Sequence, residues 1–244
     1  FEISFFLVYL CLITALQSSM GVGILVLGTP FLLILDYNIV EVFFILLPLS
    51  IKTSLINLII MRTFNKKLEI SSYKELKKFF IICIPSIILG LIILKIFQDY
   101  INFKKLVSIV IILSIGFVMM KDKIKFRINF FRITILSVVG VIHGLTNSGG
   151  TLMSLALSSN NKKNYARFNI TFFYFVLASF QYLIISMIFY DEFIYQKNIN
   201  LIWVIPLGIL LGNVLNNYID EKKYKISVNI LAIISSLFLL VDNL

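Results

Sequence analysis

The chain is poor in the residues that build most soluble active sites. It has 244 residues with 2 Cys, 1 His and 4 Pro, and only 14% of its residues are charged. Soluble domains carry roughly a quarter charged residues, so an apolar content of 59% excludes an ordinary soluble domain. Cys11 and Cys83 both lie in apolar runs, where a thiol behaves as a small hydrophobe, and no disulfide framework is predicted.

Motifs for nucleotides and metals are also missing from the sequence. There is no Walker-type Gly-x-x-x-x-Gly-Lys, no Cys/His metal spacing and no tight group of carboxylates within the apolar runs. We therefore expect no metal, no cofactor and no ATP-driven pumping by this chain alone.

The net charge of +10 comes from Lys and Arg residues in short loops between apolar spans. Cytoplasmic loops of membrane proteins are enriched in these residues, so the charge indicates topology and contact with membrane lipid rather than nucleic-acid binding. The chain opens Phe1-Glu2 without a basic segment before the apolar run. We therefore expect this first apolar segment to be a retained helix and not a cleaved signal peptide.

Two apolar segments are too long for one membrane crossing, which needs about 20 helical residues. Ile3 to Leu35 is interrupted by the small-residue cluster Ser18-Ser19-Met20-Gly21-Val22-Gly23, and Ile133 to Asn161 by Gly144-Leu145-Thr146-Asn147-Ser148-Gly149-Gly150. Each segment has the length for two helical arms that meet at a tip. Non-helical backbone at membrane depth is tolerated where protein buries it or where it lines a polar cavity, and transporters bind their cargo at such breaks.

Six further spans are predicted by length and low charge, three after each broken segment. They are Ile39 to Met61, Phe79 to Leu94 and Leu106 to Met120 in the first half, then Phe168 to Tyr190, Asn198 to Ile219 and Ile226 to Val241 in the second.

The loop charges favour hairpins over crossings for the two broken segments. If both segments cross the membrane, Lys and Arg divide almost evenly between the two faces. If both are re-entrant hairpins, 17 of the 22 basic residues gather on one face, as the positive-inside rule requires of the cytoplasmic side. The chain is thus predicted to be an all-α polytopic membrane protein with two inverted-topology halves, each a broken hairpin plus three transmembrane helices, and with both termini outside.

We expect a single membrane domain over residues 1–244, with halves at 1–125 and 126–244. A constant shift of 126 residues places Ser18 on Gly144, Gly21 on Asn147 and Gly23 on Gly149. Identities between the halves are few, so the repeat depends mainly on matched position and hydropathy.

At these two clusters the chain resembles the TauE/SafE family of sulfite exporters, also called the 4-toluene sulfonate uptake permease family. Its members have two related halves, each opening with a G-x-x-G-x-G-G signature and an apolar stretch that often contains Pro. Here the copies read Ser18 to Ile24, with Pro30 downstream, and Gly144 to Gly150. The second copy has Asn147 where the family usually has glycine. The resemblance implies transport of small sulfur-containing anions such as sulfite or sulfoacetate, usually outward.

The two tips supply the candidate substrate-binding residues. Helix N-termini offer free amides and partial positive charge to an anion, while small polar side chains add hydrogen-bond donors. Close helix packing is the alternative role for such small residues. The candidates are Gln17, Ser18, Ser19, Gly21 and Gly23 in the first half and His143, Gly144, Thr146, Asn147, Ser148, Gly149, Gly150 and Thr151 in the second, with Lys52 between them.

Three ionisable residues inside spans have two interpretations each. Lys52 either attracts an anion toward the first tip or reaches an interface. His143 either titrates during transport or is a neutral packing residue, and Gln17 holds the equivalent place in the first half. Arg167 either collects anions at the cytoplasmic mouth or sets topology, and Gln181 lies deeper in the same span, beyond Asn169.

The sequence therefore predicts a secondary transporter or facilitator for a small anion in a bacterial cytoplasmic membrane, with a homo-oligomer as an open possibility. An anion channel is an alternative. A second alternative is an intramembrane enzyme acting on a lipid or acyl group with His143 as base. A single histidine without a paired carboxylate is poorly suited to general acid–base catalysis. A structural subunit that needs a partner is the third.

Overall fold

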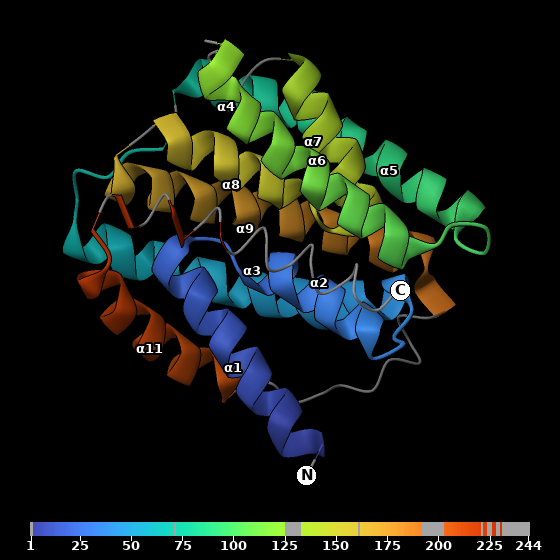
Figure 1. The fold of residues 1–244 in the computed structure, drawn as a ribbon, viewed down its shortest axis with the longest axis horizontal. Coiled ribbons are helices and arrows are strands. Elements are labelled where there is room, and N and C mark those ends of the chain that lie inside the picture. The colour runs from blue at the N-terminus through green and yellow to red at the C-terminus, as the bar shows by residue number, and fades with distance from the viewer. Residues whose placement is uncertain are drawn as a thin grey trace.

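The structure is a computed structural model that describes residues 2–70, 72–124, 133–160, 162–191 and 203–220, with the short pieces 222–223, 226–227 and 230. Within these residues every regular element is helical, which confirms the all-α prediction (Figure 1). The elements are α1 (Glu2–Met20), α2 (Ile24–Ile34), α3 (Ile39–Phe64), α4 (Tyr73–Lys78), the π-helical turn η1 (Phe79–Cys83), α5 (Ile84–Phe97), α6 (Phe103–Ile124), α7 (Ile133–Thr146), α8 (Gly149–Asn160), α9 (Lys163–Ile188) and α11 (Val204–Tyr218).

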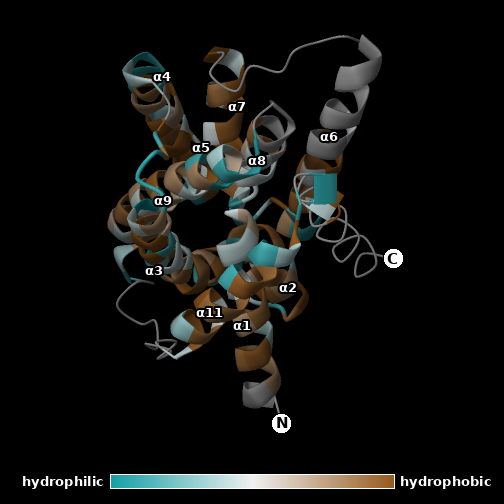
Figure 2. Ribbon diagram, turned by 90° about the vertical axis from the view of Figure 1, so that its left-hand side faces the viewer, coloured by the Kyte–Doolittle hydropathy of each residue, from teal (hydrophilic) through white to brown (hydrophobic). Residues whose placement is uncertain are grey.

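Among the residues that the structure describes, three helical stretches are long and apolar enough to cross a membrane, namely Ile39–Phe64, Tyr73–Phe97 and Lys163–Ile188. Shorter apolar helices accompany them, and Figure 2 shows apolar residues along most of the helices in the bundle. Because helices satisfy their own backbone hydrogen bonds, this all-helical architecture suits a lipid environment.

The predicted spans that lie within the described residues match helices, and capping boxes explain where two of these helices begin. The helix α3 begins at Ile39 as predicted, because Asn38 and Glu41 form a reciprocal capping box with two 2.9 Å bonds. The span predicted from Phe79 begins earlier, at Tyr73, where Ser72 and Glu75 form a second capping box. The predicted span Ile226 to Val241 lies almost wholly outside the described residues, as does the start of the span Asn198 to Ile219.

The first broken segment folds back on itself as a helical hairpin. The backbone N–H of Ile24 donates to Gln17 Oε1 at 3.2 Å, and the Tyr9 hydroxyl donates to the Leu27 carbonyl at 3.0 Å. Further from the tip, the rings of Tyr9 and Phe31 stack with centroids 3.7 Å apart. Contacts that lie further from the tip join earlier residues of α1 to later residues of α2, so the two arms run antiparallel.

The second broken segment also reverses direction. Gly149 lies directly against the backbone of Val139 and His143, so α8 starts beside the last two turns of α7. The helix α8 then runs back to Asn160, close in sequence to the start of α9 at Lys163.

Each hairpin packs against the other half of the chain through close helix contacts at small residues. The arm α7 lies on α5, where Gly140 approaches Ser86 and Gly144 approaches Ile87 and Gly90. The arm α1 lies on α11, where Gly208 approaches Thr14 and Gly212 approaches Ser18. Both contacts pair one small-xxx-small pattern with another, as close helix packing in membranes does. In both helix pairs, later residues of one helix contact later residues of the other. Each hairpin arm therefore runs parallel to the helix on which it packs.

The basic loops share one end of the bundle. Asn169 Nδ2 donates to the Glu69 carbonyl at 3.4 Å, and Lys163 Nζ donates to the Asn216 carbonyl at 2.6 Å. At the other end Lys104 pairs with Asp36 at 3.0 Å. The first hairpin thus enters from the end that holds Asp36 and Lys104, and the second from the basic end. The basic segment after α6 lies largely outside the described residues.

Candidate functional site

The first helix break is held by a fully bonded glutamine. Gln17 is completely buried, and its amide nitrogen donates to the Ser50 hydroxyl at 3.1 Å and to the Ser54 hydroxyl at 3.0 Å. Its amide oxygen accepts from the first backbone N–H of α2, at Ile24. Gln17 therefore ties both arms of the first hairpin to α3.

The residues just after Gln17 are also engaged. Arg167 Nε donates to the Ser18 carbonyl at 2.9 Å, and its Nη2 donates to Asn213 Oδ1 at 2.8 Å. The Ser18 hydroxyl accepts from Asn57 Nδ2 at 2.9 Å. A guanidinium at the last carbonyls of α1 complements the negative end of that helix. Gly21 then turns the chain with a φ of 84°, in the left-handed region that glycine tolerates.

The second helix break uses an asparagine for the same turn. Asn147 has a φ of 62°, and it stands 126 residues after Gly21, so the repeat positions share the left-handed conformation. Asparagine is the residue that tolerates this conformation best after glycine. The side chain of Asn147 lies 3.1 Å from the Thr29 hydroxyl of α2. This hydrogen bond joins the second tip to the first hairpin in the interior of the bundle.

Several buried polar groups around the second break have no hydrogen-bond partner among the described residues. They are both ring nitrogens of His143, the Asn147 side-chain oxygen, and the hydroxyls of Thr151 and Tyr174. The Tyr174 hydroxyl lies against Gly150 in the first turn of α8, and Thr151 is the next residue. Unpaired buried polar groups are costly, so this group of atoms makes the second break a candidate site for a polar ligand.

The central helices α3 and α9 each present a buried polar stripe to the tips. On α3 the stripe is Ser50, Thr53, Ser54 and Asn57, and on α9 it is Arg167, Thr171, Tyr174 and Gln181. Spacings of three, four and seven residues place each set on one helix face. The α9 stripe passes the first break at Arg167 and Thr171 and the second at Tyr174.

The structure brings together all but one of the candidate site residues predicted from sequence. Buried positions at the two breaks are occupied by Gln17, Ser18, Ser19, Gly21, Gly23, His143, Gly144, Thr146, Asn147, Ser148, Gly149, Gly150 and Thr151. Lys52 is exposed on α3, whereas its neighbours Thr53 and Ser54 are buried. The structure therefore does not bring Lys52 together with the tips.

A family comparison agrees with this geometry. The model of the family described as Sulfite exporter TauE/SafE matches residues 5–239 of the chain. The chain belongs to the TauE/SafE family. Searches of the curated proteins and of the solved structures found no match. Family membership over nearly the whole chain identifies a multi-pass membrane protein of the exporter type for sulfite or related sulfur anions.

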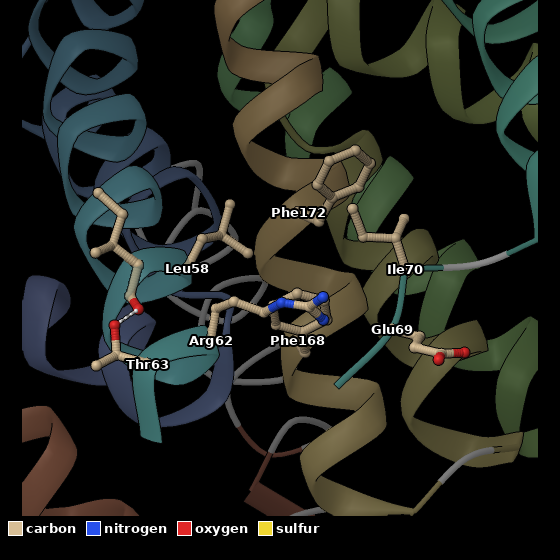
Figure 3. Close-up of a pocket in the computed structure, with 8 residues that line it drawn as sticks. Leu58, Arg62, Thr63, Glu69, Ile70, Phe168 and Phe172 are labelled. Carbon is tan, nitrogen blue, oxygen red and sulfur yellow. Dashed lines mark hydrogen bonds between the residues drawn. The ribbon is translucent and has the colours of Figure 1, made fainter. Parts of the chain in front are cut away.

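In this TauE/SafE chain an open groove of about 600 Å³ lies at the basic end (Figure 3). Arg62 extends from the last turns of α3 toward Phe168 of α9, and the loop residues Glu69 and Ile70 lie across from it. Leu58 and Phe168 in the groove are the sequence neighbours of Asn57 and Arg167 at the first tip. Groove and tip thus use adjoining faces of α3 and α9.

Sequence reasoning missed several residues of the candidate site in this TauE/SafE chain. Thr29, Ser50, Ser54, Asn57 and Tyr174 all contact the breaks. The available signal was the recurrence of polar residues at helical spacing inside otherwise apolar spans. Such a stripe on a membrane helix faces protein or a polar cavity rather than lipid.

Proposed function

We propose that the protein is a secondary transporter or facilitator that moves a small sulfur oxyanion or organosulfonate, such as sulfite or sulfoacetate, out of a bacterial cell across the cytoplasmic membrane. The halves take inverted topology in that membrane, with the basic end of the bundle in the cytoplasm. The substrate passes between the hairpin tips along the polar stripes of α3 and α9.

The observation that carries the proposal is the group of unpartnered polar atoms at the second tip. The Tyr174 and Thr151 hydroxyls lie at the N-terminus of α8, whose free backbone amides and positive dipole end favour an anion. Asn147 adds an amide at the turn that precedes this helix.

The two hairpins have different roles, one structural and one in substrate binding. The side chains of Gln17 and Ser18 at the first break already bond to α3, which makes this hairpin a support. Around the second break His143, Thr151 and Tyr174 lack such partners within the described residues, which makes it the binding element.

Outward movement of an anion needs no coupling ion. A cell that is negative inside favours the exit of an anion by about 2.3 kcal/mol per charge for each 100 mV. A facilitated flux is therefore sufficient for export.

Tyr174→Phe is the sharpest test, because it removes one hydroxyl and leaves the ring that packs on Gly150. We expect sulfite flux in proteoliposomes with a set membrane potential to fall roughly tenfold or more, since a hydrogen bond to an anion contributes about 1.5–3 kcal/mol. The half-exposed Tyr165, near the start of the same helix, supplies the matched control Tyr165→Phe, which should keep its flux.

Two results would contradict the proposal at different levels. Undiminished flux in Tyr174→Phe would remove the second tip from the path. No saturable flux of sulfite, sulfoacetate or thiosulfate in the wild type would remove the sulfur-anion substrate and leave the fold unaffected.

A further inference from the structure

Gln181 presents a buried acceptor whose orientation is determined by its neighbour. Its Nε2 donates to the His143 backbone carbonyl at 3.0 Å. A carbonyl oxygen only accepts hydrogen bonds, so the amide nitrogen must face it and the amide oxygen must point the other way. That oxygen, Oε1, is buried and has no partner within the described residues.

The Gln181 oxygen belongs to the same face of α9 as the binding residues at the tip. Gln181 follows Tyr174 by seven residues, which is about two helical turns, or roughly 10 Å along the axis. The adjacent imidazole of His143 also has two unpartnered nitrogens in the described part of the chain, and at least one of them is a donor. A substrate that moves along α9 meets hydroxyl donors at Tyr174 and then an acceptor beside an imidazole at Gln181.

The buried path carries little positive charge. Arg167 is the only Asp, Glu, Lys or Arg side chain that is buried in the described residues, and it lies at the first break, bonded to Ser18 and Asn213. Charge in a low-dielectric interior is costly and the cost rises steeply for a second charge, so neutral donors and a helix N-terminus suit a monoanion. An anion with acceptors only would also leave the Gln181 oxygen unpaired.

We propose that the second hairpin and α9 select a small monovalent sulfur anion that carries its own hydrogen-bond donor, and that Gln181 is the residue that reads this donor. The inference rests on the proposed transport function and refines its substrate. Hydrogensulfite fits the description, because it has one negative charge and one proton. The sulfite dianion, the sulfoacetate dianion and simple alkanesulfonates do not fit it, so the inference narrows the proposed substrates to anions such as hydrogensulfite.

Isethionate and ethanesulfonate form a suitable probe pair, because both are monoanionic sulfonates and they differ by one hydroxyl. The experiment measures how each inhibits sulfite flux through the full chain in proteoliposomes at one fixed pH. We expect isethionate to inhibit at an about tenfold lower concentration, since an unpaired buried acceptor costs that much in binding. In Gln181→Leu the ratio should fall toward one. Ser186→Ala, whose hydroxyl bonds only within α9, is the matched control and should keep the ratio.

The wild type alone can overturn the inference, so it stays falsifiable even where the Gln181 variant does not fold. Equal inhibition by the two sulfonates, or inhibition by neither, overturns it while sulfite flux still supports the transport function. Absence of sulfite flux instead overturns the proposed function. A ratio that stays near tenfold in a folded Gln181→Leu protein assigns the selectivity to another residue and also overturns the inference.

Discussion

At the scale of single residues, the two positions just before the helix breaks have opposite hydrogen-bonding situations. Gln17 and His143 are equivalent under the 126-residue repeat, and both are completely buried. The amide of Gln17 bonds to Ser50, Ser54 and Ile24, whereas the ring nitrogens of His143 have no partner in the described residues. A residue with all its bonds made stabilises the fold, and one without them is available to a ligand.

This difference predicts opposite effects of removing the polar group. Gln17→Leu leaves two hydroxyls and one backbone N–H with lost bonds, so we expect the unfolding free energy to fall by about 1–3 kcal/mol. His143→Leu loses no such bonds and replaces an unsatisfied group by an apolar one, so its stability should be unchanged or higher while sulfite flux falls. Thermal unfolding in detergent and flux in proteoliposomes measure the two effects. A His143→Leu protein that unfolds earlier than Gln17→Leu would show that His143 is a structural residue.

The break positions also show where residue-level sequence reasoning succeeds. The shift of 126 residues aligned Gly21 with Asn147, and both turn in the left-handed region. The alignment held because glycine and asparagine both meet that backbone requirement at low cost. The same reasoning proposed that Lys52 attracts an anion. The position of Lys52 along its span does not determine which face of the helix it occupies, and the structure places it on the exposed face of α3.

At the scale of helices, the fold depends on close contacts between each hairpin and the opposite half. Gly144 on α7 lies against the backbone of Ile87 and Leu91 on α5, where any side chain at position 144 would overlap. Such contacts let the helix backbones approach, and lipid offers no hydrophobic force to replace them.

We therefore expect Gly144→Ala to destabilise the protein by about 1–3 kcal/mol through overpacking. The matched control is Gly116→Ala in α6, because a Cβ at Gly116 meets nothing within 4 Å in the described part of the chain. Alanine is the better helix former, so this control should keep or gain stability. Unfolding midpoints in the same detergent compare the two variants, and equal midpoints would show that α7 does not approach α5 this closely.

At the scale of the whole molecule, the distribution of charge predicts which end of the bundle faces the cytoplasm. The basic segments around Lys66 and Lys163 share one end, and the end with Asp36 and Lys104 carries few basic residues. The positive-inside rule assigns the basic end to the cytoplasm.

Labelling of single cysteines in intact cells tests this orientation. On a background with Cys11 and Cys83 replaced by alanine, we expect Tyr100→Cys to react with an impermeant thiol reagent from outside, because Tyr100 is 85% exposed at the far end. Lys66→Cys should react only after the membrane is opened. Reaction of both from the same side would contradict the proposed topology.

The sequence by itself determined the helical membrane class, the two broken segments, the location of the basic loops at one end of the bundle and the residues at the tips. These features follow from local properties, namely segment length, hydropathy, loop charge and the backbone freedom of small residues. Only the tertiary structure decided which of these polar side chains are paired, because Gln17 bonds to α3, whereas the Tyr174 hydroxyl of α9 lies against Gly150 with no partner in the described residues. Hydrogen-bond satisfaction is a property of the packed molecule, so the proposed division between a supporting and a binding hairpin could not be predicted from either half alone.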